Sequence, residues 1–200
     1  MKESSPLVVL VRHGETAWSR TGHHTSHTDL PLMEEGRQMA LQLREPLKQW
    51  EFAEVWTSPL RRAIDTCELA NQGHRAQQRP DLTEWNYGDY EGMTKGEIRA
   101  RDPEWSIWKK GVPKGEKIKD VAQRADRVIA AAQKATGPVL LFSHGHMLRV
   151  LAARWLGLPP ADGRLFALNT ASISVLALNA EEGNQPLIQR WNDVSHQKKR

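Results

Sequence analysis

Cysteine is almost absent from this chain, and that excludes several kinds of protein at once. The 200 residues contain a single cysteine, Cys67. One cysteine cannot form a disulfide within the chain, and it cannot supply a cysteine-cluster metal site. Because Cys67 falls in a stretch with helical spacing of apolar residues, we expect it to be a small buried residue and not a nucleophile.

Long apolar runs are missing as well. No run approaches the roughly 18 to 20 residues that cross a bilayer. Met1–Pro6 leads straight into a predicted strand and not into the apolar segment of a signal peptide. We therefore expect a cytoplasmic protein with no membrane contact. A length of 200 residues predicts one domain, residues 1–200, which ends in a short basic tail, Gln197–Arg200.

The chain also lacks a glycine-rich phosphate loop, an internal repeat and the aromatic and basic pattern of RNA-binding domains. Its formal net charge is +4. Excess positive charge suits nucleic acid, but it equally suits a small anionic substrate. Because no nucleic-acid motif accompanies the charge, we expect a small anionic substrate and no nucleic-acid partner.

Strand-like and helix-like segments alternate along the chain. This alternation favours an α/β fold, a three-layer α/β/α sandwich around a mostly parallel sheet. The predicted strands are Leu7–Val11, Glu54–Thr57, Val139–Phe142, Leu165–Leu168 and Ser172–Leu178. The predicted helices are 34–50, which Pro46 should kink or shorten, 60–71, 117–135 and 147–156. Residues 79–115 are rich in proline, glycine and aromatic side chains, which is typical of an irregular, lid-like insertion.

Three of the predicted strands lead into residues suited to a phosphate group. Leu7–Val11 runs into Arg12 and His13, Val139–Phe142 runs into His144, and Glu54–Thr57 is followed by a pair of arginines at positions 61 and 62. Ligands of open α/β sheets bind beyond the carboxyl ends of the strands. We therefore expect both histidines and one arginine to face the same crevice, although spacing alone also allows structural histidines and exposed arginines.

Four motifs occur in a fixed order: Leu10–Thr16, Ser58–Ala63, Glu84 with Gly88 and Glu91-Gly92, and Phe142–Gly145. Together they resemble the signatures of the histidine phosphatase superfamily, the phosphoglycerate-mutase-like proteins. The resemblance extends from Leu7 to about Leu178. It implies a phosphoglycerate-mutase-like fold and a histidine phosphatase, a phosphoric monoester hydrolase that needs neither a metal nor a cofactor.

The resemblance implies five catalytic residues. His13 would be the nucleophile, forming a phosphohistidine that water hydrolyses, while its other ring nitrogen donates to a backbone carbonyl. Arg12, Arg62 and His144 would surround the transferred phosphoryl group with hydrogen-bond donors. Glu84 would protonate the leaving oxygen and then activate the water. The simpler alternative for Glu84 is a loop cap or the partner of a cation.

Further residues are implied to bind the substrate: Ser19, Thr25, Ser26, Tyr87, Gly145 and His146. Ser19 stands where many relatives have asparagine, so its side chain has a shorter reach. His23, His24 and His27 lie close together but lack a carboxylate at a convincing spacing. We expect them to contact substrate or solvent, and a metal site is the less favoured alternative.

The sequence around Glu84 also bears on the type of reaction. Phosphoglycerate mutases have Glu-Arg-His-Tyr where this chain has Glu84-Trp85-Asn86-Tyr87, so the arginine for the substrate carboxylate is missing. This difference favours hydrolysis over a mutase reaction. A cofactor-dependent mutase and a non-catalytic module that binds phosphorylated ligands are the alternatives. Whichever function holds, a homo-oligomer is an option for the protein.

Within the phosphatases, Trp18–Gly22 and Glu84–Gly92 are similar to the sedoheptulose-1,7-bisphosphatase branch. The resemblance implies a small phosphorylated metabolite, a sugar phosphate or bisphosphate, as substrate. The lysines of the lid-like segment either form a basic mouth for such a substrate or are simply a solvated face: Lys95, Lys109, Lys110 and Lys114.

Overall fold

Six strands form one sheet within residues 7–197, the part of the chain that the computed structural model describes. Met1–Pro6 and most of the predicted basic tail, Lys198–Arg200, lie outside the described residues. The sheet has the order β3-β2-β4-β1-β5-β6. Its strands are β1 (Leu7–Arg12), β2 (Glu54–Thr57), β3 (Ala76–Gln78), β4 (Val139–Ser143), β5 (Ile173–Asn179) and β6 (Gln185–Asp193). The first four strands in this order pair in parallel, and β5 pairs antiparallel with both β1 and β6, which confirms a mostly parallel sheet.

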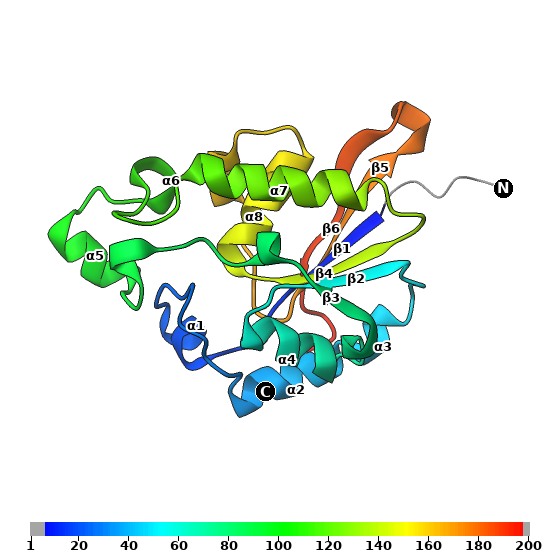
Figure 1. Ribbon diagram of the computed structural model, residues 1–200, viewed down its shortest axis with the longest axis horizontal. Coiled ribbons are helices and arrows are strands. Elements are labelled where there is room, and N and C mark those ends of the chain that lie inside the picture. The colour runs from blue at the N-terminus through cyan, green and yellow to red at the C-terminus, as the bar shows by residue number, and fades with distance from the viewer. Residues whose placement is uncertain (1–6, 198–200) are drawn as a thin grey trace.

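Helices cover both faces of the sheet (Figure 1), as the three-layer prediction requires. On one face lie α2 (Glu34–Gln42), α3 (Arg44–Leu47) and α4 (Arg61–Leu69); on the other lie α7 (Ile118–Ala132) and α8 (Gly145–Trp155). The shorter helices α1 (Ala17–Thr21), α5 (Lys95–Arg101) and α6 (Ile107–Lys110) gather at the end toward which β1 runs. Ligands of such sheets bind at this end.

The alternation of side chains along β1 explains its continuous apolar sequence. Val8 and Leu10 pack into the cluster formed with α7 and α8, whereas Val9 and Val11 pack into the cluster on the opposite face. Because both faces are buried, the positions from Val8 to Val11 are all apolar. Each such side chain contributes roughly 1.5–3 kcal/mol by burial, which fixes the strand in register and sets where it ends.

Helix α7 bears out the amphipathic pattern of the sequence. Its buried residues are Val121, Ala122, Ala125, Val128 and Ala132. Cys67 on α4 is buried at 1% exposure, as expected. Burial, with a smaller contribution from the charge of Glu68, raises the pKa of its thiol to about 12. The thiol therefore behaves as a small apolar group.

The predicted strand at Leu165–Leu168 is wrong. Pro160–Leu165 forms a 3₁₀-helix, and the chain up to Leu168 has no regular structure. The Leu165 side chain is 65% exposed, so it is not part of a buried strand. The last strand is instead β6, which the sequence did not predict because it alternates weakly and carries Pro186 near its start at the edge of the sheet.

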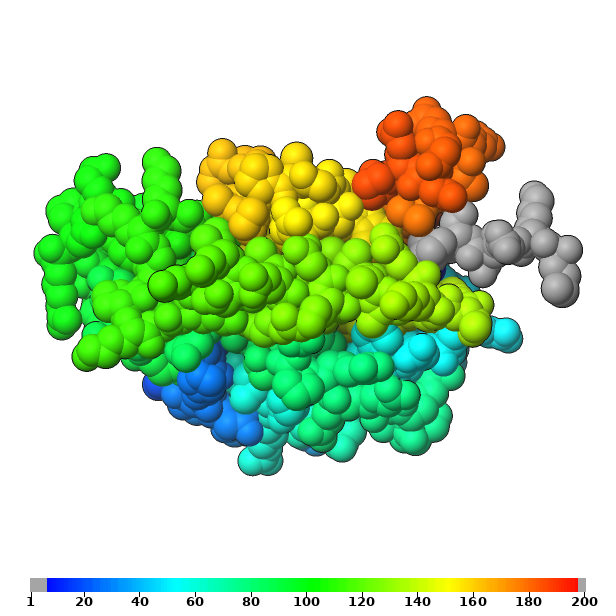
Figure 2. All heavy atoms as spheres, turned by 45° about the horizontal axis from the view of Figure 1, so that its top comes forward, coloured from blue at the N-terminus to red at the C-terminus, as the bar shows by residue number. Residues whose placement is uncertain are grey.

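The lid-like segment 79–115 is more regular than its composition suggests. It contains α5 and α6, and its aromatic residues Trp85, Tyr87 and Trp105 are at most 2% exposed within the core cluster of α7 and α8. In the space-filling view this green segment is continuous with α7, while the orange turn between β5 and β6 projects from the body (Figure 2). The segment therefore forms a fixed wall at the carboxyl end of β1.

Candidate active site

The carboxyl ends of β1 and β4 bring the two predicted histidines together. Arg12 of β1 lies opposite Ser143 of β4, and the amide of His13 donates to the Ser143 carbonyl over 3.0 Å. The residue that follows each strand is a histidine, so both histidines lie at the same edge of the sheet. The rings of His13 and His144 lie 5.2 Å apart between centroids. The ends of the two strands therefore lie side by side.

His13 is held in one tautomer. Its Nδ1 lies 2.7 Å from the carbonyl oxygen of Gly14. Because a carbonyl only accepts, the ring proton is on Nδ1 and Nε2 keeps its lone pair. Burial, followed by the charges of Arg62 and Arg12, holds the pKa of the imidazole well below its ordinary value. A neutral imidazole with a free Nε2 is a nucleophile.

Gly14 is required by the close approach of another backbone. A Cβ at Gly14 would lie 2.4 Å from the carbonyl oxygen of Gly36, the buried glycine of α2. The Gly14 amide donates to Oγ1 of Thr66 over 2.9 Å, and the same hydroxyl donates to the carbonyl of Arg62 over 2.6 Å. These contacts fix the loop after β1, and with it His13, against α2 and α4.

Arg12 presents an unpartnered donor in the cavity wall. Its Nη1 donates to the carbonyl oxygen of Leu168 over 2.6 Å, but its Nε is buried and has no hydrogen-bond partner among residues 7–197. Burial lowers the pKa of this guanidinium, and the charge of Glu84 opposes that shift. An unmet buried donor costs roughly 1–3 kcal/mol. Arg12 is therefore suited to bind an anion beside His13.

Arg62 and His144 lie deeper than predicted from the sequence. Arg62 is 1% exposed, and its Nε donates to Nδ1 of His144 over 3.2 Å. The remaining amino groups of Arg62 donate to the carbonyls of Thr25, Ser26 and Thr28, each over 3.2 Å. Neither Arg62 nor His144 is among the residues that line the cavity. Their contacts with a phosphoryl group remain predictions.

His144 has both ring nitrogens engaged. Since Nδ1 accepts from Arg62, the proton of the neutral ring is on Nε2, which donates to Oγ of Ser58 over 2.7 Å. The ring is fully buried, and burial, followed by the charge of Arg62, holds its pKa well below the ordinary value. Arg62 thus orients His144, and burial together with the charge of Arg62 favours the neutral ring.

Glu84 reaches the cavity at the start of α8. Its Oε1 accepts from the amides of Trp85 and Met147, both over 2.9 Å, and its Oε2 accepts from the amide of His146 over 3.0 Å. The side chain is 7% exposed and lines the cavity. Oε1 therefore accepts two backbone hydrogen bonds and Oε2 accepts one.

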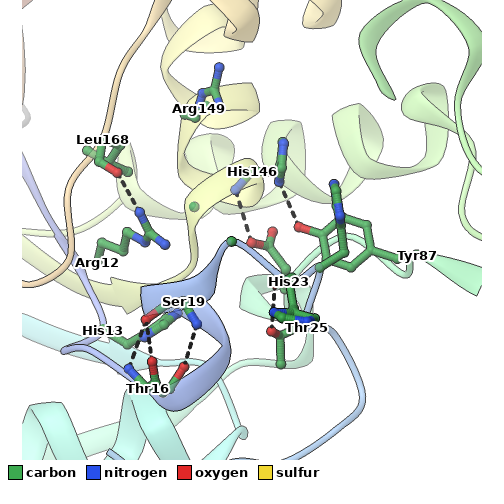
Figure 3. Close-up of a pocket in the computed structure, with 14 residues that line it drawn as sticks. Arg12, His13, Thr16, Ser19, His23, Thr25, Tyr87, His146, Arg149 and Leu168 are labelled. Atoms are coloured by element: carbon green, nitrogen blue, oxygen red, sulfur yellow. Dashed lines mark hydrogen bonds between the residues drawn. The ribbon is translucent and has the colours of Figure 1, made fainter. Parts of the chain in front are cut away.

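A cavity of about 170 Å³ joins these groups, and Figure 3 shows its walls. It is lined by His13, Arg12 and Glu84 and by five of the predicted substrate-binding residues, Ser19, Thr25, Tyr87, Gly145 and His146. The sequence did not predict four other lining residues: Thr16, Gly22, Arg149 and Leu168.

The hydroxyl groups of the predicted substrate-binding serines and threonine are already engaged. That of Thr25 donates to the carbonyl of His23 over 3.1 Å. The hydroxyl of Ser19 accepts from the amide of Thr16 over 2.8 Å and donates to the Thr16 carbonyl over 3.1 Å, which caps α1 (Figure 3). Ser26 is buried and does not line the cavity; its hydroxyl donates to Glu91 over 2.7 Å. Ser26 here organises the 25–28 loop, and its contact with substrate remains a prediction.

The histidine cluster divides into two parts. His23 and His24 line the cavity, whereas His27 is exposed. Nδ1 of His24 donates to the carbonyl of Met93 over 2.8 Å, and the His24 ring stacks 6.1 Å from that of His146. Burial lowers the pKa of both rings. Among the described residues, no three His, Cys, Asp or Glu side chains are grouped to hold a metal ion.

Tyr87 lies beside His146 in the wall of the cavity that also contains Glu84. Its hydroxyl shares a hydrogen bond of 2.7 Å with Nδ1 of His146. Burial, followed by the charge of Glu84, raises the Tyr87 pKa well above its ordinary value, so the phenol keeps its proton. The hydroxyl therefore meets the cavity as a neutral group that is already hydrogen-bonded.

Comparison with known proteins agrees with this geometry. Residues 8–194 match the family model of the histidine phosphatase superfamily, branch 1. The chain belongs to this family. An acid phosphatase of Mycobacterium tuberculosis is 42% identical over 84% of this chain and 84% of its own length.

Further relatives show the range of activities in the family. A sedoheptulose 1,7-bisphosphatase of Saccharomyces cerevisiae is 35% identical over 79% of this chain and 70% of its own length. Proteins named 2,3-bisphosphoglycerate-dependent phosphoglycerate mutase match at 31% to 34% identity. The solved structure of an open reading frame product of Mycobacterium tuberculosis superposes with a TM-score of 0.87 at 37% identity, covering 93% of this chain and 96% of that one. The phosphoglycerate-mutase-like fold is thereby confirmed.

No helix within residues 7–197 is both long enough and apolar enough to cross a membrane.

Proposed function

We propose that this protein is a metal-independent phosphomonoesterase that hydrolyses a small phosphorylated metabolite through a phosphohistidine on Nε2 of His13. One observation carries the proposal: the bond from Nδ1 to the Gly14 carbonyl leaves Nε2 as the free, unprotonated nitrogen of a cavity-lining residue. The positive charge that a phosphate needs is supplied by side chains, of which Arg12 has an unmet Nε donor in the same cavity wall.

The reaction proceeds in two displacements. First, the Nε2 lone pair of His13 attacks phosphorus, the bond from phosphorus to the leaving oxygen breaks, and Glu84 gives that oxygen a proton. Next, the Glu84 carboxylate takes a proton from water, the water oxygen attacks phosphorus, and the bond from phosphorus to Nε2 breaks. Inorganic phosphate leaves, and both His13 and Glu84 return to their starting states. Arg12 stabilises the negative charge on the phosphoryl oxygens during both steps.

Trp85 supports hydrolysis over phosphoryl return to an organic acceptor. It occupies the position at which mutases carry an arginine, and it is fully buried with its indole N–H donated to the Glu116 carbonyl over 2.8 Å. No cation at this position is available for a glycerate carboxylate. The similarity to an acid phosphatase and a sugar bisphosphatase supports the same choice and a sugar phosphate or bisphosphate as substrate.

The test is phosphate release by purified wild type, His13→Ala and a surface control, His74→Ala, with 4-nitrophenyl phosphate and a panel of sugar phosphates. We expect His13→Ala to abolish both turnover and the acid-labile, base-stable phosphoenzyme, and His74→Ala to retain both, because the His74 side chain is exposed. Turnover or phosphoenzyme formation by His13→Ala would contradict the mechanism.

Further measurements separate the alternatives. Chelator should leave the rate unchanged, and loss of activity that added metal restores would point to the histidine cluster as a metal site. Transfer of phosphate to glycerate in place of release would identify a mutase. Binding of phosphorylated ligands with no turnover would identify a binding module. Cytoplasmic location and association of identical chains remain predictions from the sequence.

A further inference from the structure

Glu84 lies on a stretch of chain without regular structure, between the 3₁₀-helices Pro80–Leu82 and Gly88–Tyr90. A group that gives a proton to a leaving oxygen must lie within hydrogen-bond reach of it, and a displacement of about 1 Å can cost much of the rate. Since neither a helix nor a strand contains Glu84, other contacts must fix its backbone.

Glu116 and Arg124 form a largely buried ion pair beside this stretch. Glu116 lies just before α7, and Arg124 lies within it. Nε of Arg124 donates to Oε1 of Glu116 over 2.7 Å, and Nη2 donates to Oε2 over 2.8 Å. Two parallel hydrogen bonds of this kind fix the orientation of both side chains. The side chains of Arg124 and Glu116 are only 13% and 18% exposed.

Arg124 holds the chain immediately before Glu84. Its third nitrogen, Nη1, donates to the carbonyls of Asp81 and Thr83, both over 2.8 Å. The Thr83 carbonyl belongs to the peptide bond that joins Thr83 to Glu84. The planar guanidinium thus binds a carboxylate and two backbone carbonyls at once, which the compact ammonium of a lysine cannot reproduce.

Glu116 holds the chain immediately after Glu84. Its carbonyl accepts from the indole of Trp85 over 2.8 Å, and its amide donates to the carbonyl of Asn86 over 3.0 Å. Its Oε2 also accepts from the Asn86 amide over 3.3 Å. Glu84 therefore lies between two anchored points of the chain, and the ion pair joins the two anchors.

Arg124 also contacts the helix that binds the Glu84 carboxylate. Its Nη1 lies 3.4 Å from Sδ of Met147 on α8, and the Met147 amide donates to Oε1 of Glu84 over 2.9 Å. Met147 is fully buried, and α7 packs beside α8 (Figure 1). Arg124 therefore touches both the chain that carries Glu84 and a residue that orients its carboxylate.

We propose that the ion pair between Glu116 and Arg124 positions Glu84 for proton transfer, with Arg124 as the main positioning residue. Neither residue lines the cavity, so the pair acts through Glu84 and not on the substrate. A buried ion pair is often no more stabilising than apolar residues of similar size. The orientation that it imposes on Glu84 gives this pair a role beyond stability. The inference rests on the proposed function, in which Glu84 protonates the leaving oxygen.

Arg127 provides a matched control one turn further along α7. Its Nε and Nη2 donate to the carboxylate of Asp81 over 3.0 Å and 2.7 Å, so it also joins α7 to the stretch before Glu84. Its side chain is 58% exposed, however, and its contact is with the Asp81 side chain and not with the peptide bond of Glu84. Loss of Arg127 removes an ion pair without releasing Glu84.

The test compares Arg124→Met and Arg127→Met with wild type, using benzyl phosphate and 4-nitrophenyl phosphate. The esters are similar in size, but benzyl alcohol needs a proton to leave and 4-nitrophenolate does not. The measured quantity is the ratio of kcat/KM for the two esters, which does not depend on the fraction of enzyme that is folded. Arg124→Met should lower kcat/KM for benzyl phosphate roughly 10- to 100-fold more than for 4-nitrophenyl phosphate. Arg127→Met should leave the ratio unchanged.

Two further variants keep the test independent of folding. Arg124→Lys keeps the charge but loses the planar fork, so its ratio should be intermediate. The double variant Glu116→Gln with Arg124→Met leaves no unpaired buried carboxylate, and its ratio should fall as in Arg124→Met. Thermal midpoints are measured for all variants, because a purely structural role would lower the midpoint and leave the ratio unchanged.

A last combination shows whether the effect passes through Glu84. In a Glu84→Gln background, Arg124→Met should change the ratio no further, because no proton donor remains to be positioned. A wild-type ratio in both Arg124→Met and the double variant, an equal fall in Arg127→Met, or a further fall in the Glu84→Gln background would overturn the inference. Each of these outcomes leaves the proposed function standing if wild type forms the phosphoenzyme and His13→Ala does not. An unchanged ratio in Glu84→Gln alone would instead refute the proposed role of Glu84, and the inference with it.

Discussion

The ring centroids of His13 and His144 lie 5.2 Å apart, and the Arg62 guanidinium donates directly to the second ring. Two histidines and an arginine therefore share one buried space in which the permanent charge is positive. Protonation of either ring would place like charges close together in a medium of low polarity. This relationship makes both rings neutral and determines how the enzyme responds to pH.

The activity should persist into mildly acidic solution. Because burial and the neighbouring arginines hold the His13 pKa well below its ordinary 6.5, the nucleophile stays unprotonated as pH falls through 6.5. A profile of kcat/KM against pH with 4-nitrophenyl phosphate tests this. A loss of activity centred near pH 6.5 would indicate that His13 has an ordinary pKa and would contradict the prediction. Such a limb belongs to His13 if its midpoint moves to higher pH in Arg62→Met, because this variant removes a nearby positive charge.

The stability of the fold, unlike the activity, should fall as the solution becomes mildly acidic. The folded His144 pKa lies below the ordinary 6.5 of an unfolded chain, so below that pH the unfolded state binds protons that the folded state does not. The free energy of unfolding then falls as pH decreases from 6.5 toward the folded pKa, by up to about 1.4 kcal/mol per pH unit for each such histidine.

Urea unfolding at several values between pH 7.5 and pH 5 measures this slope. His144→Asn should lower the difference in bound protons between the unfolded and folded states by about one. The slope then becomes flatter, whatever the effect of the substitution on absolute stability. His74→Asn serves as the control because the His74 side chain is exposed. Equal slopes in wild type and His144→Asn would show that His144 is not a buried neutral group.

Gly14→Ala should damage both folding and catalysis. The new Cβ would lie 2.4 Å from the Gly36 carbonyl, so either α2 or the loop carrying His13 must move. We expect a loss of roughly 1–3 kcal/mol in unfolding free energy and a fall in kcat. Gly96→Ala is the matched control, since its Cβ meets only Thr94 Oγ1, at 3.8 Å, and alanine favours the exposed helix α5. Wild-type activity in Gly14→Ala would show that this close approach does not position His13.

Glu84→Gln should affect substrates according to their leaving groups. An alkyl phosphate needs a proton on the leaving oxygen, so its kcat should fall by roughly 10²- to 10⁴-fold. The rate of the phosphorylation step with 4-nitrophenyl phosphate should fall much less, because 4-nitrophenolate leaves without a proton. Burst kinetics with the two ester types measures the difference, with Glu182→Gln as an exposed control. Equal losses for both would argue against Glu84 as the proton donor.

The sheet was predictable where burial on both faces imposes a continuous apolar sequence. β1 and β4 have this property, and so their ends at His13 and His144 could be placed from the sequence. The edge strands β3 and β6 carry exposed polar side chains, so their pairing depends on a neighbour and not on their own pattern. Leu165–Leu168 is the opposite case. Its apolar sequence predicted a strand, but the folded chain does not pair this segment with the sheet.

The amino-acid sequence by itself determined the family of this protein. The order of the motifs follows from residue identity, and the family resemblance that they carry implied the tautomer of His13 and the absence of a mutase arginine at Trp85. The tertiary structure decided which side chains contact one another at the site. Arg62 turns toward the 25–28 loop and His144, and Arg149 is fixed by Gly163 and Trp108 at the wall of the cavity. These partners come from segments far apart in the chain, and only packing brings their side chains into contact.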